Sequence, residues 1–367
     1  MSSTWGERIK VTLFGESRGQ AVGVVLDGLP PGEAICLGEC QAEMDRRAPG
    51  RSELSTTRRE SDTAHVLSGL CGGVTTGAPL CAMIYNEDAR QDQPETTRIA
   101  RPGHADYTAF VKYRGFADKR GGGFFSGRLT APLVFAGAVA RQVLARRGVD
   151  VGARIVSIGT AADTRAFEPS RQAIAGLRAS ELPCGAEAAE AMRREILRAK
   201  ADGDSVGGVV EAFALGVPPG LGSPFFGSAE SVLSALLFSV PGVKGVEFGD
   251  GFAVSAKRGS LANDAILAEG GRVSFASNHA GGVLGGITNG AAVVVRVAFK
   301  PTPSIALQQQ TVDLDTMEPA TISTAGRNDP CFVPRAVPVV EACVALSILD
   351  LYTNTTMPDL RGNFPSG

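Results

Sequence analysis

The order of the apolar segments along the chain is the feature that most limits its fold. Apolar runs of strand length lie between glycine-containing turns at residues 9–14, 21–26, 153–158, 209–215 and 291–299. Helical stretches occur among them, but strands and helices do not alternate regularly, as they do in a doubly wound parallel sheet. No low-complexity linker or repeat of fixed period divides the chain. The order therefore predicts a mixed α+β architecture.

Helix start and stop signals support the helical part of that prediction. A helix opens near Pro132, because proline fits the first helical turn, and it ends before Gly148. The other helical patterns cover residues 186–201, 228–239 and 334–352. The last of them keeps a continuous apolar stripe and predicts a helix that packs into the core.

The composition provides ample material for a core and no strong surface charge. Of the 367 residues 44% are hydrophobic, which suffices for one large domain or two ordinary ones. The formal net charge is -2, so no general attraction to nucleic acid or membranes is expected. The first ten residues lack an apolar run after a basic segment, and no stretch approaches the length that spans a bilayer. We therefore expect a cytoplasmic protein.

The cysteines are an odd, scattered set. They stand at positions 36, 40, 71, 81, 184, 331 and 343, and no C-x-x-C pattern occurs. This spacing argues against both a disulfide framework and a structural zinc site. We expect the thiols to be reduced and mostly buried, and we predict no metal site.

Positive charge is concentrated early in the chain. Residues 46–128 hold 13 basic and 9 acidic residues, and 29 of the chain's 36 basic residues are arginine. Within this stretch, Arg101-Pro102-Gly103-His104-Ala105-Asp106 precedes a glycine-rich segment at residues 120–128. The arginine fork binds carboxylate and phosphate oxygens in pairs, and glycine lets backbone bend closely around a ligand. We attribute the overall arginine excess to lineage bias, and we interpret the cluster as an anion site with a proton donor.

Neither a P-loop nor a dinucleotide-binding glycine fingerprint occurs, so other glycine clusters must be judged by the polar residues beside them. Those clusters lie at residues 15–19, 277–286 and 326–331, and a rigid proline-containing loop at residues 300–304 carries similar polar groups. In the first, Ser17 and Arg18 are expected at the exposed tip of a turn after a strand. A serine or aspartate in a turn usually bonds its own backbone, so Ser17, Ser126 and Asp329 would each be interpreted as structural in isolation. Their occurrence together favours a ligand site.

These segments, in this order and over nearly the whole length, resemble the chorismate synthase family. The resemblance is carried by Arg101 to Asp106 and by residues 45–47, 203–205, 243–247, 249–251, 277–282 and 335–338. Members of that family convert 5-enolpyruvylshikimate 3-phosphate to chorismate and phosphate in aromatic amino acid biosynthesis. No short accidental pattern would produce such a series.

The resemblance implies the fold, the cofactor and the reaction. It implies one domain over residues 1–367, a β-α-β sandwich with helices between two antiparallel sheets, assembled as a homotetramer. It also implies a phosphate lyase that performs an anti-1,4-elimination with reduced FMN and no net oxidation or reduction. NADPH is the reductant in those family members that reduce their own flavin.

The resemblance also implies roles for individual residues. His104 corresponds to a histidine that keeps the reduced flavin correctly protonated, and Asp329 to a carboxylate that relays a proton near flavin N5. Ser17 and Arg18 occupy the family's first catalytic motif. The implied substrate ligands are Arg47, Arg101, Arg128, Arg327, Ser17 and Ser126. The implied flavin ligands are Ser126, Gly285, Lys300, Pro301, Thr302, Pro303, Ser304, Arg327 and Arg47, and Arg47 also matches a position associated with NADPH.

Several positions depart from the family pattern. Arg18 stands where the second catalytic histidine is usual, and arginine cannot donate a proton at any working pH. Phe124 replaces a histidine or arginine, and Asn328 replaces a histidine. Glu53 replaces a substrate-binding arginine, and Arg51, two residues earlier, is expected to reach the same space. Loss of a general acid costs about a hundredfold in rate or more. The leading hypothesis is therefore a phosphate lyase of weakened activity. The alternative is a catalytically impaired homologue that retains flavin or substrate binding.

Overall fold

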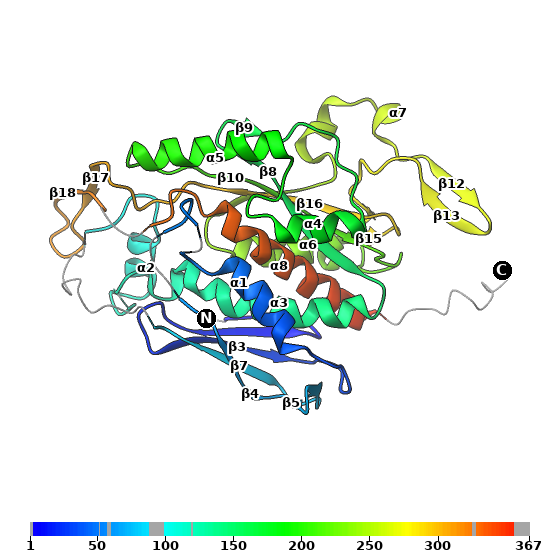
Figure 1. Ribbon diagram of the computed structural model, residues 1–367, viewed down its shortest axis with the longest axis horizontal. Coiled ribbons are helices and arrows are strands. Elements are labelled where there is room, and N and C mark those ends of the chain that lie inside the picture. Colours follow the sequence, from blue (N-terminus) through cyan, green and yellow to red (C-terminus); the bar gives the residue numbers. More distant parts are fainter. Residues whose placement is uncertain are drawn as a thin grey trace.

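The computed structural model describes residues 3–50, 52–56, 60–87, 99–118, 120–324 and 328–355, and two antiparallel sheets dominate this part (Figure 1). The first sheet has the order β1 (Thr4–Trp5), β2 (Lys10–Gly15), β3 (Ala21–Asp27), β7 (Leu80–Tyr85), β4 (Ala64–Ser68). The second has the order β11 (Val243–Phe248), β16 (Val293–Phe299), β10 (Gly208–Leu215), β8 (Asp150–Ile158), β9 (Ala161–Ala162). In β16 the buried Val293, Val295 and Val297 alternate with half-buried residues, as a sheet with one covered face requires.

A layer of helices lies between the two sheets (Figure 1). It consists of α1 (Leu37–Arg47), α3 (Thr130–Ala145) and α8 (Val333–Asn354), with α6 (Ala229–Ser239) beside α8. Helix α3 packs on β3 and β7 of the first sheet, whereas α8 packs on β8 and β10 of the second. One hydrophobic core joins residues from both sheets and from these helices. The predicted α+β sandwich, with helices between antiparallel sheets, is confirmed.

The remaining elements lie around this core. Outside the second sheet, α4 (Arg171–Ala179) packs on β8, and α5 (Ala186–Ala201) on β8 and β9. Short hairpins are formed by β5 (Leu70–Cys71) with β6 (Val74–Thr75), β12 (Ile266–Glu269) with β13 (Arg272–Phe275), β14 (Val283–Leu284) with β15 (Ile287–Thr288), and β17 (Gln309–Val312) with β18 (Pro319–Ile322). The short helices are α2 (Asp106–Lys112), α7 (Gly259–Ala262), η1 (Gly123–Phe125), η2 (Gly127–Leu129), η3 (Phe225–Gly227) and η4 (Gly251–Ala256).

The five predicted strands correspond to β2, β3, β8, β10 and β16, and the four predicted helices to α3, α5, α6 and α8. Helix α6 begins after Ser228, whose side chain accepts a hydrogen bond from Ser231 N–H, as an N-cap serine should. The chain leaves α3 at Gly148, where φ is +78°. Helix α1 was not predicted, because its N-cap, Cys36, makes no side-chain cap and few of its residues are apolar.

Helix α8 corrects one expectation from the sequence. Its 22 residues are long and apolar enough to cross a membrane by length and composition, so the expectation that no stretch approaches that length was wrong. However, 89% of its apolar window is buried inside the protein, which makes it the core helix of this fold. The buried carboxylate of Asp350 accepts hydrogen bonds from the backbone N–H groups of Arg8 at 2.7 Å and Ile9 at 2.8 Å. These bonds attach the first sheet to the end of α8.

The cysteines are free thiols with mixed exposure. Cys40, Cys331 and Cys343 are buried, but Cys36 and Cys71 are exposed, so the expectation of general burial was wrong for these two. Burial raises the pKa of Cys40 and of Cys331 to about 12. These two thiols therefore remain protonated and unreactive at neutral pH.

Helices α3 and α8 approach each other closely at Gly137. A Cβ at this position would lie 2.2 Å from the Cβ of Ala342, a distance that no packing tolerates. We expect Gly137→Ala to lower the free energy of unfolding by about 1–3 kcal/mol, because overpacking outweighs the better helix propensity of alanine. Urea denaturation of the purified variants measures this difference.

The matched control is Gly176→Ala in α4, where a Cβ would meet nothing within 4 Å. There the propensity of alanine acts alone, and we expect a gain of up to about 1 kcal/mol. Equal effects of the two substitutions would contradict the close packing of α3 on α8.

Candidate active site

A cavity of about 990 Å³ opens where loops from both halves of the chain meet. Its walls come from the β2–β3 turn, the end of α1, the loop before α2, the η1–η2 segment, the α6–β11 connection, the loop after β16 and the start of α8. These segments are distant in sequence, and the sandwich brings them together. The volume is large enough for two small molecules side by side.

The cavity has a strong excess of positive charge. Its described lining residues include seven cations and two carboxylates, and the carboxylates are Glu60 and Asp329. The cations are Arg18, Arg47, Arg101, Arg128, Lys244, Lys300 and Arg335. The lining also includes aromatic side chains, which are Tyr113, Phe124, Phe125, Phe238, Phe299 and Phe332. The arrangement suits an anionic ligand together with an apolar, planar one.

Most residues singled out in the sequence line this cavity. They are Ser17, Arg18, Arg47, Arg101, His104, Ser126, Arg128, Lys300, Thr302, Pro303, Ser304 and Asp329. Pro301 instead lines an adjoining hollow of about 280 Å³, to which Lys300 and Thr302 also contribute. Gly285 lies in the turn between β14 and β15 and is not among the lining residues. Arg327 lies outside the described residues, as does Arg51.

The departures from the family pattern divide into two groups. Arg18, Phe124 and Asn328 all line the cavity. Glu53 lies apart from it and pairs with Arg193 of α5 at 2.9 Å. Of the chain's three histidines, only His104 lines the cavity, because His65 lies in β4 and His279 pairs with Asp250 at 2.9 Å. His104 is therefore the single imidazole available to a ligand there.

The orientation of His104 is fixed by Asp106. Its Nδ1 lies 2.6 Å from Asp106 Oδ1, while Arg101 binds the same carboxylate through Nε and Nη2, each at 2.8 Å. Burial alone would raise the pKa of Asp106, but hydrogen bonds from Arg101 and His104 outweigh burial and hold that pKa well below its usual range. The ionised carboxylate makes Nδ1 the donor, which leaves Nε2 to exchange a proton in the cavity.

Ser17 corrects another expectation. It does not lie at an exposed tip, because its side chain and backbone are only 3% exposed and its N–H donates to Gly123 O at 3.1 Å. Its Oγ is buried with no hydrogen-bond partner among the described residues. Gly121, at φ +63°, covers it so closely that a Cβ there would lie 3.3 Å from Ser17 Oγ and 3.4 Å from Arg18 Nε. A ligand in the cavity would satisfy this orphan hydroxyl.

Asp329 is held at both carboxylate oxygens. Oδ1 accepts the backbone N–H of Thr56 at 2.8 Å, and Oδ2 accepts a bond from Arg335 Nη1. Arg335 in turn donates from Nε to the backbone oxygen of Arg47 at 2.9 Å, which joins the start of α8 to the end of α1. No separate role for Arg335 was predicted from the sequence. Its place six residues after Asp329, at the start of a predicted helix, was the available signal.

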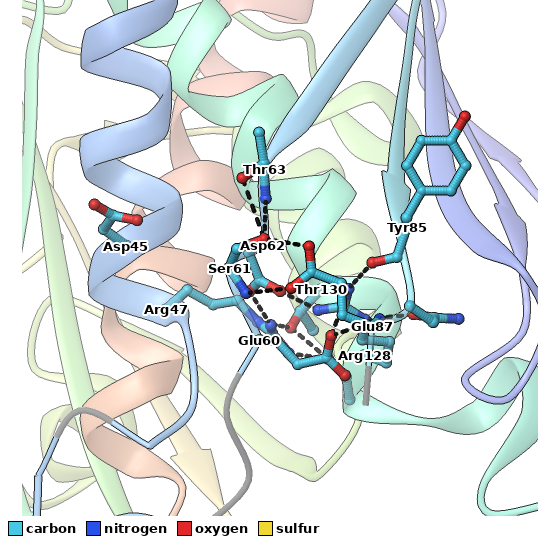
Figure 2. Close-up of polar contacts among 12 residues, drawn as sticks. Asp45, Arg47, Glu60, Ser61, Asp62, Thr63, Tyr85, Glu87, Arg128 and Thr130 are labelled. Atoms are coloured by element: carbon cyan, nitrogen blue, oxygen red, sulfur yellow. Dashed lines mark hydrogen bonds and ion pairs between the residues drawn. The ribbon is translucent and has the colours of Figure 1, made fainter. Parts of the chain in front are cut away.

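Arg47 and Arg128 are buried in the cavity wall, and both bind Asp62, a residue that the sequence analysis did not single out (Figure 2). Burial lowers the pKa of Arg47 to about 10, with help from the nearby charges of Arg335 and Arg128, whereas Asp62 opposes this shift. Arg47 therefore stays protonated at neutral pH. Asp62 lies in a polar stretch without periodicity, so no sequence signal marked it.

A cationic cavity with one oriented imidazole and one tethered carboxylate has the composition of an enzyme site for a small anionic substrate. Comparison with known proteins identifies the family. The model of the chorismate synthase family matches residues 9–353. The chain therefore belongs to the chorismate synthase family, as its sequence motifs indicated.

Individual members of the family are similar to this chain over nearly its full length. A protein from Thermococcus gammatolerans named chorismate synthase is 49% identical over 348 residues, which cover 94% of this chain and 96% of that protein. Another of that name, from Dehalococcoides mccartyi, is 45% identical over 354 residues, 96% of each chain. A crystal structure titled chorismate synthase superposes with a TM-score of 0.76 at 30% identity, covering 95% of this chain and 93% of that one.

The contact between Asp106 and His104 can be tested by Asp106→Asn. The neutral amide has one acceptor oxygen and an NH2 group, so it cannot bind Arg101 through two oxygens and hold His104 Nδ1 as a donor at the same time. We expect at least roughly a tenfold loss of turnover in the family reaction. The matched control is Asp118→Asn, which removes a pair to the exposed Arg120 and should change turnover by less than about twofold. Equal losses in the two variants would contradict this role.

The depressed pKa of Asp106 also predicts a pH dependence of stability. A carboxyl whose pKa is lowered by folding stabilises the folded state above its ordinary pKa of 3.8, and this contribution is lost as the pH falls through the folded-state value. The difference in unfolding free energy between the native chain and Asp106→Asn should thus be constant from about pH 5 to 7 and shrink below pH 3.8. Denaturant titrations at several pH values measure it.

Proposed function

We propose that this chain catalyses the chorismate synthase reaction, the anti-1,4-elimination of phosphate from 5-enolpyruvylshikimate 3-phosphate. The observation that carries the proposal is the shared cavity of Arg101, His104, Arg128 and Asp329, in a chain that matches the family over nearly its whole length. The substrate carries one phosphate and two carboxylates, and a cavity with seven cations and two acids suits such a ligand.

The substrate ligands in this proposal are Ser17, Arg47, Arg101, Ser126 and Arg128, with Arg327 added by the family resemblance alone. Ser17 supports it by its unpartnered Oγ. Arg101 supports it because Nη1 makes no hydrogen bond to the described residues, while Nε and Nη2 are fixed by Asp106. A guanidinium that is held on one side and open on the other binds an anion with little loss of entropy.

The cavity also fits the flavin that the family uses. The aromatic residues suit a planar ring, and the segment Lys300, Thr302, Pro303 and Ser304 lies along the same cavity. Thr302 Oγ1 is buried without a partner among the described residues, so a polar group of the ligand would satisfy it. Reduced FMN held there would supply electron density to the elimination without net oxidation or reduction. We leave Gly285 out of the flavin site, because it does not line the cavity in this chain.

The proposal does not extend to NADPH at Arg47. This side chain is 4% exposed, and Nε, Nη1 and Nη2 are all bonded to protein groups. Two of its five N–H groups remain for a small anion in the wall of the site, but a side chain so enclosed does not suit contact with a dinucleotide such as NADPH.

Different residues of the cavity exchange protons and stabilise charge. His104 Nε2 is the atom through which the imidazole can exchange a proton with a ligand, while the tethered carboxylate of Asp329 offers a second proton relay. Arg18 keeps its charge at every working pH, so it stabilises the departing phosphate as a dianion and supplies no proton. The protein walls exclude water from the ligands, which strengthens each of these interactions.

We also propose a homotetramer of single-domain subunits in the cytoplasm, as in the family. The single core that joins both sheets supports one domain. Exposed aromatic and aliphatic side chains support self-association, since Phe226 is 97% and Phe252 86% exposed, and Leu261, Ile266 and Val273 are exposed on neighbouring segments. Apolar surface of this kind usually marks a protein interface.

The direct test is an anaerobic assay with dithionite-reduced FMN and 5-enolpyruvylshikimate 3-phosphate. We expect chorismate and inorganic phosphate in equal amounts, with no net consumption of reduced flavin. Folded protein that forms no chorismate above background would overturn the proposal and favour an impaired homologue.

Arg18→His tests the assignment of position 18. Restoring a group that can protonate the leaving phosphate should raise turnover by about tenfold or more, because general acid catalysis is typically worth 10²–10⁴-fold. With histidine at position 18, turnover should fall again at basic pH, because the imidazole loses its proton there. The native chain should lack this basic limb of the pH profile. Arg120→His, which changes an arginine that is exposed and pairs with Asp118, is the matched control and should leave turnover unchanged. No gain from Arg18→His would contradict the assignment.

A further inference from the structure

We propose that Asp62 is the positioning residue of the anion site, holding Arg47 and Arg128 side by side so that both present donors to the substrate. This inference rests on the proposed function and assigns a role to a residue behind the cavity wall. Arg47 and Arg128 line the cavity, whereas Asp62 does not.

The geometry assigns one arginine to each carboxylate oxygen (Figure 2). Arg47 Nη1 donates to Asp62 Oδ2 at 2.6 Å, and Arg128 Nη1 donates to Asp62 Oδ1. Asp62 is 1% exposed, and the two arginines are each 4% exposed. A single buried carboxylate thus bridges α1 and the η2 segment that leads into α3.

The other donors of each guanidinium are also fixed. Arg47 donates from Nε to Thr130 Oγ1 and from Nη2 to Gly127 O, both at 3.1 Å. Arg128 donates from Nε to Asn86 Oδ1 at 2.8 Å and from Nη2 to Tyr85 O at 3.1 Å. Since a guanidinium has five N–H groups, Arg47 keeps two for a ligand. Arg128 also keeps two, although Glu60 Oε2 lies 3.7 Å from its Nη2. The two side chains are therefore preorganised walls of the site.

Charge explains why a carboxylate is needed here. Two buried guanidinium groups repel each other, and burial of an unpaired charge is costly. Burial would raise the pKa of Asp62, but Arg47 and Arg128 hold it below its ordinary value, so the carboxylate stays ionised. Because Asp62 lies behind the arginines, it offsets their repulsion without presenting its own negative charge to an anionic substrate.

The backbone of Asp62 gives independent support. Its φ is +50°, in the left-handed region that non-glycine residues rarely adopt. Such a conformation persists only where the surroundings determine it, and it is common at functional sites. Here it directs a buried carboxylate between two cations.

The experiment compares Asp62→Asn with the native enzyme in the anaerobic assay. The amide offers one oxygen acceptor and places an NH2 group toward the other arginine, so one guanidinium is released and repelled. We expect KM for 5-enolpyruvylshikimate 3-phosphate to rise by about tenfold or more, with a smaller fall in kcat. The matched control is Glu341→Gln, which neutralises a buried carboxylate that pairs with Arg46 at 2.5 Å outside the cavity. It should lower thermal stability and leave KM unchanged.

A double-mutant cycle separates positioning from general stability. In an Arg128→Lys background, Asp62→Asn should raise KM much less than it does in the native chain, because the partner that it positions is already altered. Asp62→Glu keeps the charge but displaces it, so it should also raise KM. This second variant tests the proposal if Asp62→Asn fails to fold.

The outcomes are distinct. A native chain without activity defeats the proposed function. An active native chain whose KM is unchanged by Asp62→Asn or Asp62→Glu, or whose KM rises equally with Glu341→Gln, overturns the role of Asp62. Independent, multiplicative effects of Asp62→Asn and Arg128→Lys overturn it as well.

Discussion

The close packing of α3 on α8 is the constraint on which the site depends. These helices meet at Gly137 and Ala342 with no room for a further methyl group. The start of α3 lies just after Arg128, and α8 starts just after Asp329. Both N-termini therefore reach the same cavity, and their helix dipoles add to its positive potential. The end of α1 delivers Arg47 to the same place, so the central helices carry the site.

Sequence reasoning predicted the parts of the fold that depend on local pattern. The bounds of α5 and the start of α6 follow from periodicity and an N-cap serine. The site was predictable where a glycine turn carried an unusual polar residue, as at His104. Ser17 was predicted as exposed and is buried, because its environment comes from Gly121 and Gly123, about a hundred residues away. Asp62 was missed for the same reason, since its partners lie on other elements and nothing local distinguishes it from a surface aspartate.

The substitutions at positions 18, 124 and 328 have a common effect on the cavity. Each removes a histidine or basic residue of the family pattern, and all three positions line the cavity. What remains is one imidazole among seven cations. The site therefore relies more on fixed charge and less on proton donation at the leaving group. Phosphate is a tolerable leaving group even when it is not protonated. The permanent charge of Arg18 can therefore replace part of the stabilisation that a histidine supplies.

The groups that face the cavity share a pattern of support. His104 is held by Asp106, Asp329 by Arg335 and Thr56, and Arg47 with Arg128 by Asp62. In each case an opposite charge or a backbone donor from another segment fixes the functional group before any ligand binds. Fixed groups lose little entropy on binding, and the charges that they place need not reorganise when phosphate departs. The cost of such a site is a set of buried ion pairs, which contribute less to stability than apolar packing would. The apolar contact of α3 with α8 supplies that stability, and so the core and the site depend on the same two helices.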